Sequence, residues 1–178
     1  MSRLMIYADT APATPTLITE DAATIAAALA PIGVRFERWD SPVALTPDAE
    51  PATVLAAYQP YLDTLMGARA GSADVIRMTA DNPAAPALRE KFLAEHIHTE
   101  DEVRFFVEGG GSFVLHVDGK VFDAHCTAGD LISVPAGTKH WFDAGPAPQF
   151  TALRVFQDTT GWTPHYTGDA ISERFPVA

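Results

Sequence analysis

The chain has 178 residues, of which 47% are hydrophobic and 20% are charged, and its formal net charge is −11. This length and composition predict a globular protein with one substantial core, and we expect one domain over residues 1–178. The acidic charge, without a cluster of lysines and arginines, argues against nucleic acids and membranes as partners. Because the sequence shows neither a secretion signal nor an apolar stretch long enough to span a bilayer, we expect a cytoplasmic protein.

The first third of the chain predicts short strands that alternate with helices. Residues 11–16, which contain prolines and threonines, are expected to form a loop. Thr19 is a candidate N-cap, with Glu20 and Asp21 in the first turn, for an alanine-rich helix that ends near Ala30. The strands expected in the first 80 residues are residues 4–7, 34–39 and 74–79.

Two further helices are predicted before the middle of the chain. The first covers residues 51–66, with Pro60 as a kink or a restart, and the second is a short helix over residues 87–94. One face of the first helix carries an apolar stripe with helical spacing, which we expect to face the core. The stripe consists of Val54, Leu55, Tyr58, Tyr61, Leu62 and Leu65.

The second half of the chain predicts several short strands separated by turns, which is typical of a β-sandwich or a small barrel. Gly109–Gly111 are expected at a turn between two of these strands. Asp118 and Gly119 form a dipeptide that favours a two-residue type I′ hairpin turn. The predicted strands are residues 103–107, 113–117, 120–126, 131–134, 139–142 and 150–156.

The most informative feature of the chain is a set of four potential metal ligands: His96, His98, Glu102 and His140. Two histidines two positions apart on a strand project from the same face, and Glu102 joins them if a short turn restarts the strand. Imidazoles and a carboxylate suit iron, nickel, zinc or manganese, and four ligands leave coordination positions open for a substrate. We therefore predict one divalent metal ion per chain.

Glycine and proline residues lie at characteristic offsets around these ligands. Gly109 follows the first three, and Gly129, Pro135 and Gly137 precede His140. The pattern resembles the two metal-binding motifs of the cupin superfamily, in which one segment supplies two histidines and a glutamate and a later strand supplies a third histidine. This resemblance implies a mostly β fold of the α+β kind: a double-stranded β-helix, or jelly-roll barrel, with N-terminal helices packed outside.

The remaining histidines and the single cysteine have no comparable pattern. His116 alternates with apolar residues, so we expect it to face away from them. His125 is next to Cys126, but no further ligand lies at a suitable spacing, and we interpret Cys126 as a small buried hydrophobic residue. His165 lies in a turn-rich segment and is expected at the surface.

Alternation along the strands suggests which side chains surround the metal. Arg104 shares a strand face with Glu102, and Phe142 shares one with His140. Arg154 lies between aromatic and small residues, and burial of an arginine is costly without an anionic partner. Anion recognition by Arg104 and Arg154 is one interpretation. The alternative for Arg104 is a salt bridge with Glu95, Glu100, Asp101 or Glu108.

Several longer segments resemble the bacterial acireductone dioxygenase family. The likeness runs from about Val34 to Asp169, and the residues before Gly33 contribute little to it. The segment of residues 102–109 is much more specific than the spacing of the cupin motifs. The other similar segments are residues 33–39, 87–93, 95–101, 130–136, 140–143 and 166–169.

This resemblance implies an enzyme of the methionine salvage pathway that acts on 1,2-dihydroxy-3-keto-5-methylthiopentene and O2. With iron(II), the family forms 2-keto-4-methylthiobutyrate and formate. With nickel(II), it forms 3-methylthiopropionate, carbon monoxide and formate. The expected cofactor is one Fe(II) or Ni(II) per chain, and we hypothesise that the bound metal, rather than the geometry of the histidines, selects the products.

The resemblance also implies residue roles by position. The implied metal ligands are His96, His98, Glu102 and His140. Glu102 and Arg104 are the expected catalytic residues, and Arg104 is expected to hold the anionic oxygens of the substrate. The implied substrate contacts are Arg104, Phe92, Phe142, Arg154 and Trp162. The sequence leaves open whether Lys139 and Arg154 face the cavity or solvent.

Two other classes of function remain open from the sequence. One is a different metal-dependent cupin enzyme, and the other is a non-catalytic cupin that binds a small ligand without consuming O2. Within the single domain, we expect flanking helices and strands over about residues 1–90, the barrel over about 91–160 and a tail over 161–178. The lack of a heptad pattern favours a monomer.

Overall fold

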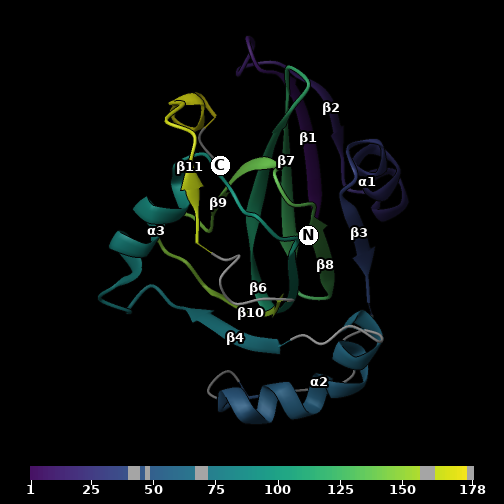
Figure 1. The fold of residues 1–178 in the computed structure, drawn as a ribbon, viewed down its shortest axis with the longest axis vertical. Coiled ribbons are helices and arrows are strands. Elements are labelled where there is room, and N and C mark those ends of the chain that lie inside the picture. Colours follow the sequence, from purple (N-terminus) through teal and green to yellow (C-terminus); the bar gives the residue numbers. More distant parts are fainter. Residues whose placement is uncertain (40–44, 47–48, 67–71, 157–162, 176–178) are drawn as a thin grey trace.

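The structure, a computed structural model, describes residues 1–39, 45–46, 49–66, 72–156 and 163–175. Eleven strands and three α-helices are present in these ranges (Figure 1). The strands are β1 (Arg3–Ala8), β2 (Pro15–Thr19), β3 (Arg35–Arg38), β4 (Ser72–Met78), β5 (His96–Ile97), β6 (Glu102–Val117), β7 (Lys120–Thr127), β8 (Asp130–Val134), β9 (Lys139–Asp143), β10 (Phe150–Phe156) and β11 (His165–Tyr166). The helices are α1 (Ala22–Leu29), α2 (Pro51–Met66) and α3 (Ala85–Leu93), with short 3-10 helices η1 (Ala30–Ile32) and η3 (Ile171–Arg174).

Strand β6 is the longest strand, and it joins the two parts of the sheet. Its first half pairs with β8 and β10, and its second half pairs with β7 and β9. From there the sheet continues through β7 to β1 and β2 in one direction, and through β9 to β5 and β11 in the other. Among the described residues this path of strands does not close into a ring. One strand therefore belongs to both parts of the sheet.

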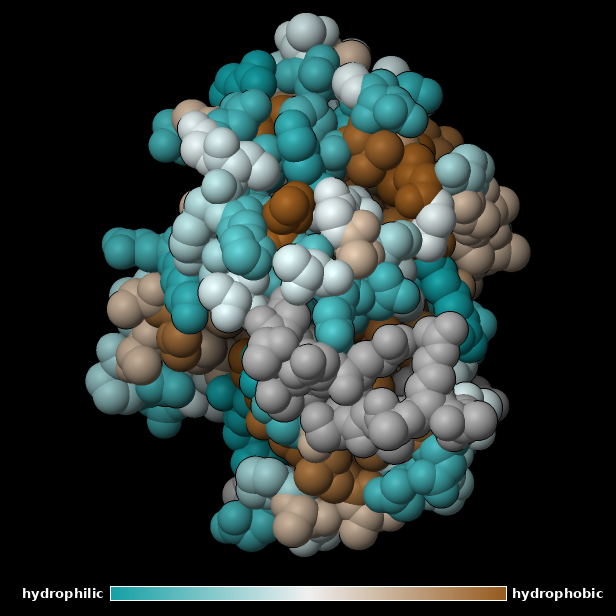
Figure 2. Space-filling view, viewed as in Figure 1, coloured by the Kyte–Doolittle hydropathy of each residue, from teal (hydrophilic) through white to brown (hydrophobic). Residues whose placement is uncertain are grey.

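The helices flank the sheet, as the sequence predicts, and Figure 1 shows α1 beside β3, α2 below β4 and α3 near β9. Helix α2 buries Val54, Tyr58 and Leu62 of its apolar stripe against a cluster that includes Phe105 and Leu153. Its interior Pro60 does not divide the helix. None of the described helices has the length and apolar character needed to cross a membrane. In Figure 2 the visible face is mostly hydrophilic, with a hydrophobic patch next to α1.

The expected turn at Gly109–Gly111 is wrong, because β6 runs through these three glycines. Gly109 pairs with Phe150 of β10, while Gly110 pairs with Thr127 of β7. The ladder between β6 and β10 shifts its register just before this point, which marks a β-bulge. The glycines allow one strand to bend from one set of partners to another, where the sequence pattern suggested two separate strands.

The expected N-cap of α1 is also wrong. Thr19 ends strand β2, where it pairs with Leu4, and the loop expected over residues 11–16 is correspondingly shorter. The N-cap is Asp21, whose carboxylate accepts a hydrogen bond from the backbone N–H of Thr24 at 2.9 Å. Because pairing with β1 extends the strand to Thr19, the helix can begin only after Asp21.

Other local predictions are confirmed. Asp118 and Gly119 have φ values of 51° and 71°, as a type I′ turn between β6 and β7 requires. Cys126 is fully buried among apolar residues, and His165 is exposed. His116 points away from the apolar core and bonds to Glu95.

Gly109 provides a test of the bend in β6. Its φ is +65°, and an added Cβ would lie 1.8 Å from the carbonyl oxygen of Gln149. Gly109→Ala combines a left-handed backbone cost of about 1–2 kcal/mol with this backbone clash, so we expect it to lower the free energy of unfolding by about 3 kcal/mol or more. Urea denaturation of the metal-free protein measures the change.

The matched control is Gly145→Ala. Gly145 also has a positive φ, +78°, but an added Cβ would meet nothing within 4 Å. Only the backbone cost of about 1–2 kcal/mol is expected there. Equal losses of stability in the two variants would show that close contact at Gly109 does not constrain β6.

Candidate metal centre

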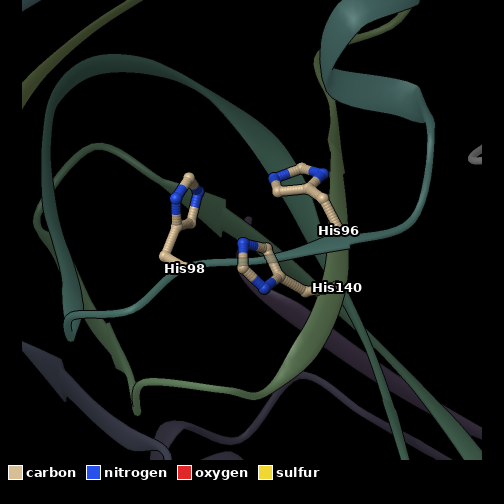
Figure 3. Close-up of side chains that lie close together, drawn as sticks. All are labelled: His96, His98 and His140. Carbon is tan, nitrogen blue, oxygen red and sulfur yellow. The ribbon is translucent and has the colours of Figure 1, made fainter. Parts of the chain in front are cut away.

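Three histidine side chains meet at the edge of the sheet. His96 lies on β5 and His140 on β9, and the two residues pair directly across these strands. His98 follows immediately after β5. One ring nitrogen from each of the three lies within 4.8 Å of the others, and Figure 3 shows the three rings turned toward a common space. Pairing of two short strands thus brings together histidines that are far apart in the sequence.

Backbone groups orient two of these rings. Nδ1 of His96 donates a hydrogen bond to the carbonyl of Ala94 at 2.7 Å, and Nδ1 of His140 donates to the carbonyl of Thr138 at 2.7 Å. A neutral imidazole that donates from Nδ1 keeps a lone pair on Nε2. The rings of His96 and His140 therefore present Nε2 as a potential metal ligand, in the arrangement that metal-binding histidines adopt.

Glu102 lies beside the three histidines and is only 4% exposed. Its Oε2 is 3.0 Å from Nε2 of His140 and 3.5 Å from Nε2 of His98. Nδ1 of His140 carries the proton that is donated to the carbonyl of Thr138. In a neutral His140, Nε2 therefore has no proton, and its lone pair faces a carboxylate oxygen of Glu102. Such an arrangement is repulsive unless the ring gains a second proton or a cation lies between the two groups. This donor set fits a divalent metal ion.

The electrostatics of the site favour ligands without protons. Burial, reinforced by His140, lowers the pKa of His96 to about 4, and burial also lowers the pKa of His98. Burial alone would raise the pKa of Glu102, but the Arg104 guanidinium and the neighbouring imidazole of His140 bring it below its ordinary value. At neutral pH, His96 and His98 are neutral and Glu102 is charged, so few protons compete with a metal.

These groups line a cavity of about 280 Å³. Arg104 lies in its wall, 3% exposed, with Nη2 donating to Oε1 of Glu102 at 2.8 Å. The guanidinium also lies over the rings of Phe113 and Phe142, at 5.2 and 5.0 Å from their centroids. Its Nε and Nη1 are buried and have no hydrogen-bond partner in the part of the chain that the structure describes. Buried donors of this kind fit an anionic ligand.

The rest of the cavity wall is mostly apolar and comes from other elements. Phe92 and Leu88 are on α3, Ile76 is on β4, and Phe142 is on β9. The ring of Phe142 lies against Gly111 of β6, where an added Cβ would be 2.4 Å from the ring. A glycine at this point of β6 leaves room for the aromatic wall.

Two further cations reach the cavity. Arg154 lines it from β10, directly across the ladder from Arg104, and pairs with Asp74 through Nε at 2.8 Å and through Nη2. Lys91 lines it from the last turn of α3. Lys139, whose orientation the sequence left open, is exposed and borders a separate hollow with His116.

The structure brings together almost all the residues that the sequence predicted for this site. The three histidines, Glu102 and Arg104 share one cavity with three predicted substrate contacts, which are Phe92, Phe142 and Arg154. Trp162 lies outside the described residues. The alternative of an ion pair between Arg104 and one of four other acidic residues is not observed among the described residues, where Glu102 is its partner.

Sequence reasoning missed some residues of the cavity. Ile76, Leu88 and Lys91 belong to segments with no chemical motif, and only the packing of β4 and α3 places them here. Phe113 does not line the cavity but lies under the guanidinium of Arg104. It could have been found, because alternation along the predicted strand of residues 113–117 places it on the face opposite His116. The contact between the buried Glu95 and the partly buried His116, which lie 2.8 Å apart, could not be predicted from the sequence, because no local pattern relates the two residues.

A mostly β fold of cupin type with flanking helices, and three imidazoles that converge beside a buried carboxylate, define this chain as a metal-binding cupin. The sequence model of the ARD/ARD′ family matches residues 3–164, and the chain belongs to that family.

Individual relatives agree with this membership. The chain is 66% identical to acireductone dioxygenases from Acidiphilium cryptum and Granulibacter bethesdensis, over 100% of this chain and 99% and 100% of those proteins. A solved structure, acireductone dioxygenase from Bacillus anthracis with a cadmium ion in its active centre, is similar with a TM-score of 0.79 at 31% identity. That match covers 93% of this chain and 98% of the other.

Proposed function

We propose that this protein is an acireductone dioxygenase of methionine salvage, which reacts 1,2-dihydroxy-3-keto-5-methylthiopentene with O2. The observation that carries the proposal is the single cavity shared by three imidazoles, Glu102 and a buried Arg104 with two unused donor groups. The full-length relatives with this name support the same activity. The reaction is cytoplasmic, and the protein acts as a monomer.

The proposed metal ligands are His96, His98, Glu102 and His140. Three neutral nitrogens and one carboxylate suit Fe(II) and Ni(II), and one negative ligand would leave a net charge near +1 on the centre. When bound, the ion would supply Lewis-acid charge and open positions for the oxygens of an anionic enediolate. The identity of the metal, iron or nickel, selects between the two sets of products.

The residues around the metal would hold and shield the substrate. Nε and Nη1 of Arg104, which have no hydrogen-bond partner among the described residues, would donate to anionic oxygens, while Nη2 remains on Glu102. Phe92 and Phe142 would contact the carbon chain of the substrate and exclude water from it. Arg154 would add a second positive charge from the facing strand, and Trp162 is proposed as a further contact.

The activity is tested by O2 uptake and product analysis with metal-free protein reconstituted separately with iron(II) and nickel(II). We expect rapid uptake of O2 with an acireductone, keto acid and formate with iron, and carbon monoxide with nickel. Metal binding with no uptake above the non-enzymatic background would instead favour another cupin enzyme or a ligand-binding cupin. Equal product ratios with the two metals would show that the metal does not select the products.

Glu102→Ala tests the carboxylate ligand. Because the variant loses the only charged group in the proposed ligand set, we expect its affinity for nickel(II) to fall at least about tenfold. Measurement of bound metal after dialysis, and competition with a chelator, report the change.

Glu108→Ala is the matched control, since Glu108 lies on the same strand but borders a different hollow. It is expected to keep the metal content of the wild type. Full metal content in Glu102→Ala would mean that Glu102 is not a ligand.

Arg104→Ala tests the proposed anion-binding residue. The variant should still bind the metal, but the loss of charge-assisted hydrogen bonds to the substrate should cost about 2 kcal/mol, or roughly thirtyfold in kcat/KM. Steady-state O2 uptake with nickel-loaded protein measures this parameter, and metal analysis of the same samples checks the occupancy.

Arg35→Ala removes an arginine that pairs with Glu37 on the outside of β3 and should leave kcat/KM unchanged. If Arg104→Ala turned over like this control, the role of Arg104 would be limited to its ion pair with Glu102.

A further inference from the structure

Glu95 is a buried acidic residue that immediately precedes the ligand strand β5 and does not line the metal cavity. It is 1% exposed. Its Oε2 is 2.8 Å from Nδ1 of His116, and its Oε1 accepts a hydrogen bond of 2.7 Å from the hydroxyl of Thr167. Nε2 of His116 in turn lies 3.6 Å from Oδ2 of Asp9. The carboxylate thus connects three segments that are distant in the sequence.

The backbone at Glu95 is attached to the same C-terminal segment. The N–H of Thr167 donates to the carbonyl of Glu95 at 3.0 Å, and Tyr166 of β11 pairs with His96 of β5. The segment of residues 163–167 is therefore held against β5 by main-chain bonds and by the side chain of Glu95. β11 is an end strand of the sheet path, and in Figure 1 it lies next to α3.

Both ends of this attachment reach the metal cavity. The carbonyl of Ala94, next to Glu95, accepts the hydrogen bond that orients the ring of His96. Pro164, in the attached segment, lines the cavity together with the three histidines. A shift of β5 would therefore change the orientation of the His96 ring, and a shift of residues 163–167 would move the cavity wall.

Burial of the Glu95 carboxylate is energetically unfavourable for a group that only holds two strands together. A buried charged group needs partners for both oxygens, and loss of one partner leaves an unsatisfied group. The amide or apolar side chain that would serve a purely structural contact would not impose this penalty. What the carboxylate adds is a geometry defined by two short bonds in different directions, to His116 on β6 and to Thr167 beyond β11.

We propose that Glu95 is a positioning residue for the metal centre. Held by His116 and Thr167, it fixes the backbone of residues 94–96 and the segment of residues 163–167, and it thereby orients His96 for the metal and holds the cavity wall at Pro164. This inference rests on the metal site of the proposed function. Groups that hold metal-binding histidines in place commonly change metal affinity by 10-fold to 100-fold when they are removed.

The test compares nickel(II) affinity, measured by competition with a chelator, in the wild type, Thr167→Val, Thr167→Ser and Glu95→Gln. Thr167→Val removes one hydroxyl at almost constant volume, and we expect affinity to fall about tenfold or more. Thr167→Ser keeps the hydroxyl and should stay within about threefold of the wild type, a difference of less than 1 kcal/mol. Glu95→Gln should weaken binding at least as much as Thr167→Val, since Gln offers only one acceptor oxygen.

Thr16→Val is the control, because it removes a threonine hydroxyl that donates one hydrogen bond, to the backbone carbonyl of Ile6, on β2 and away from the metal cavity. The melting temperature of each metal-free variant separates stability from positioning. A structural role alone would lower this temperature and leave the nickel affinity of the folded protein unchanged, which would overturn the inference. Equal losses of affinity in Thr16→Val and Thr167→Val would overturn it as well.

The wild-type measurement separates a failure of the proposed metal site from a failure of the proposed role of Glu95. If the wild type bound no nickel, the metal site of the proposed function would fail. If the wild type bound nickel and Thr167→Val bound it equally well, the metal site would stand and only the role of Glu95 would be rejected. Thr167→Val keeps the test decisive even where Glu95→Gln does not fold.

Discussion

The buried negative charge of Glu102 is the constraint on which the rest of the site depends. A carboxylate that is 4% exposed is stable only among groups that compensate its charge. Oε1 accepts a hydrogen bond from Nη2 of Arg104 at 2.8 Å, and Oε2 faces Nε2 of His140 at 3.0 Å. The first contact sets the position of the proposed anion-binding group, and the second leaves a place for a cation. The proposed metal ligands and the proposed substrate-binding arginine thus meet at one carboxylate.

The fold serves this arrangement by bringing short ligand segments to one long strand. β6 carries Glu102 and Arg104 on one face, and its second half pairs with β9, which carries His140. Through its pairing with β9, β5 adds His96, and His98 follows directly after it. The bend at Gly109 lets β6 pair within both parts of the sheet. The contacts of Glu95 next to β5 add a further attachment for this strand, which is only two residues long and carries His96.

The sequence predicted the parts of the site that depend on alternation and on residue chemistry. The four candidate ligands and Arg104 lie together as expected, because strand parity decides which side chains share a face. It did not predict features that depend on long-range pairing. Thr19 became the end of a strand through its pairing with β1, and β6 continued through Gly109, with a bulge just before it, through its pairing with β10. The ion pair of Glu95 and His116 needs the whole sheet to form, so no local pattern could reveal it.

The central claim is that Glu102 and the three histidines bind one metal ion. It is tested most directly by a crystal structure of the nickel-loaded protein, with anomalous diffraction to locate the metal. The account predicts one nickel ion per chain, bonded to imidazole nitrogens of His96, His98 and His140 and to a carboxylate oxygen of Glu102, with Arg104 still at the cavity wall. A nickel ion at another place, or one held by the histidines while Glu102 stays bonded only to Arg104, would contradict it.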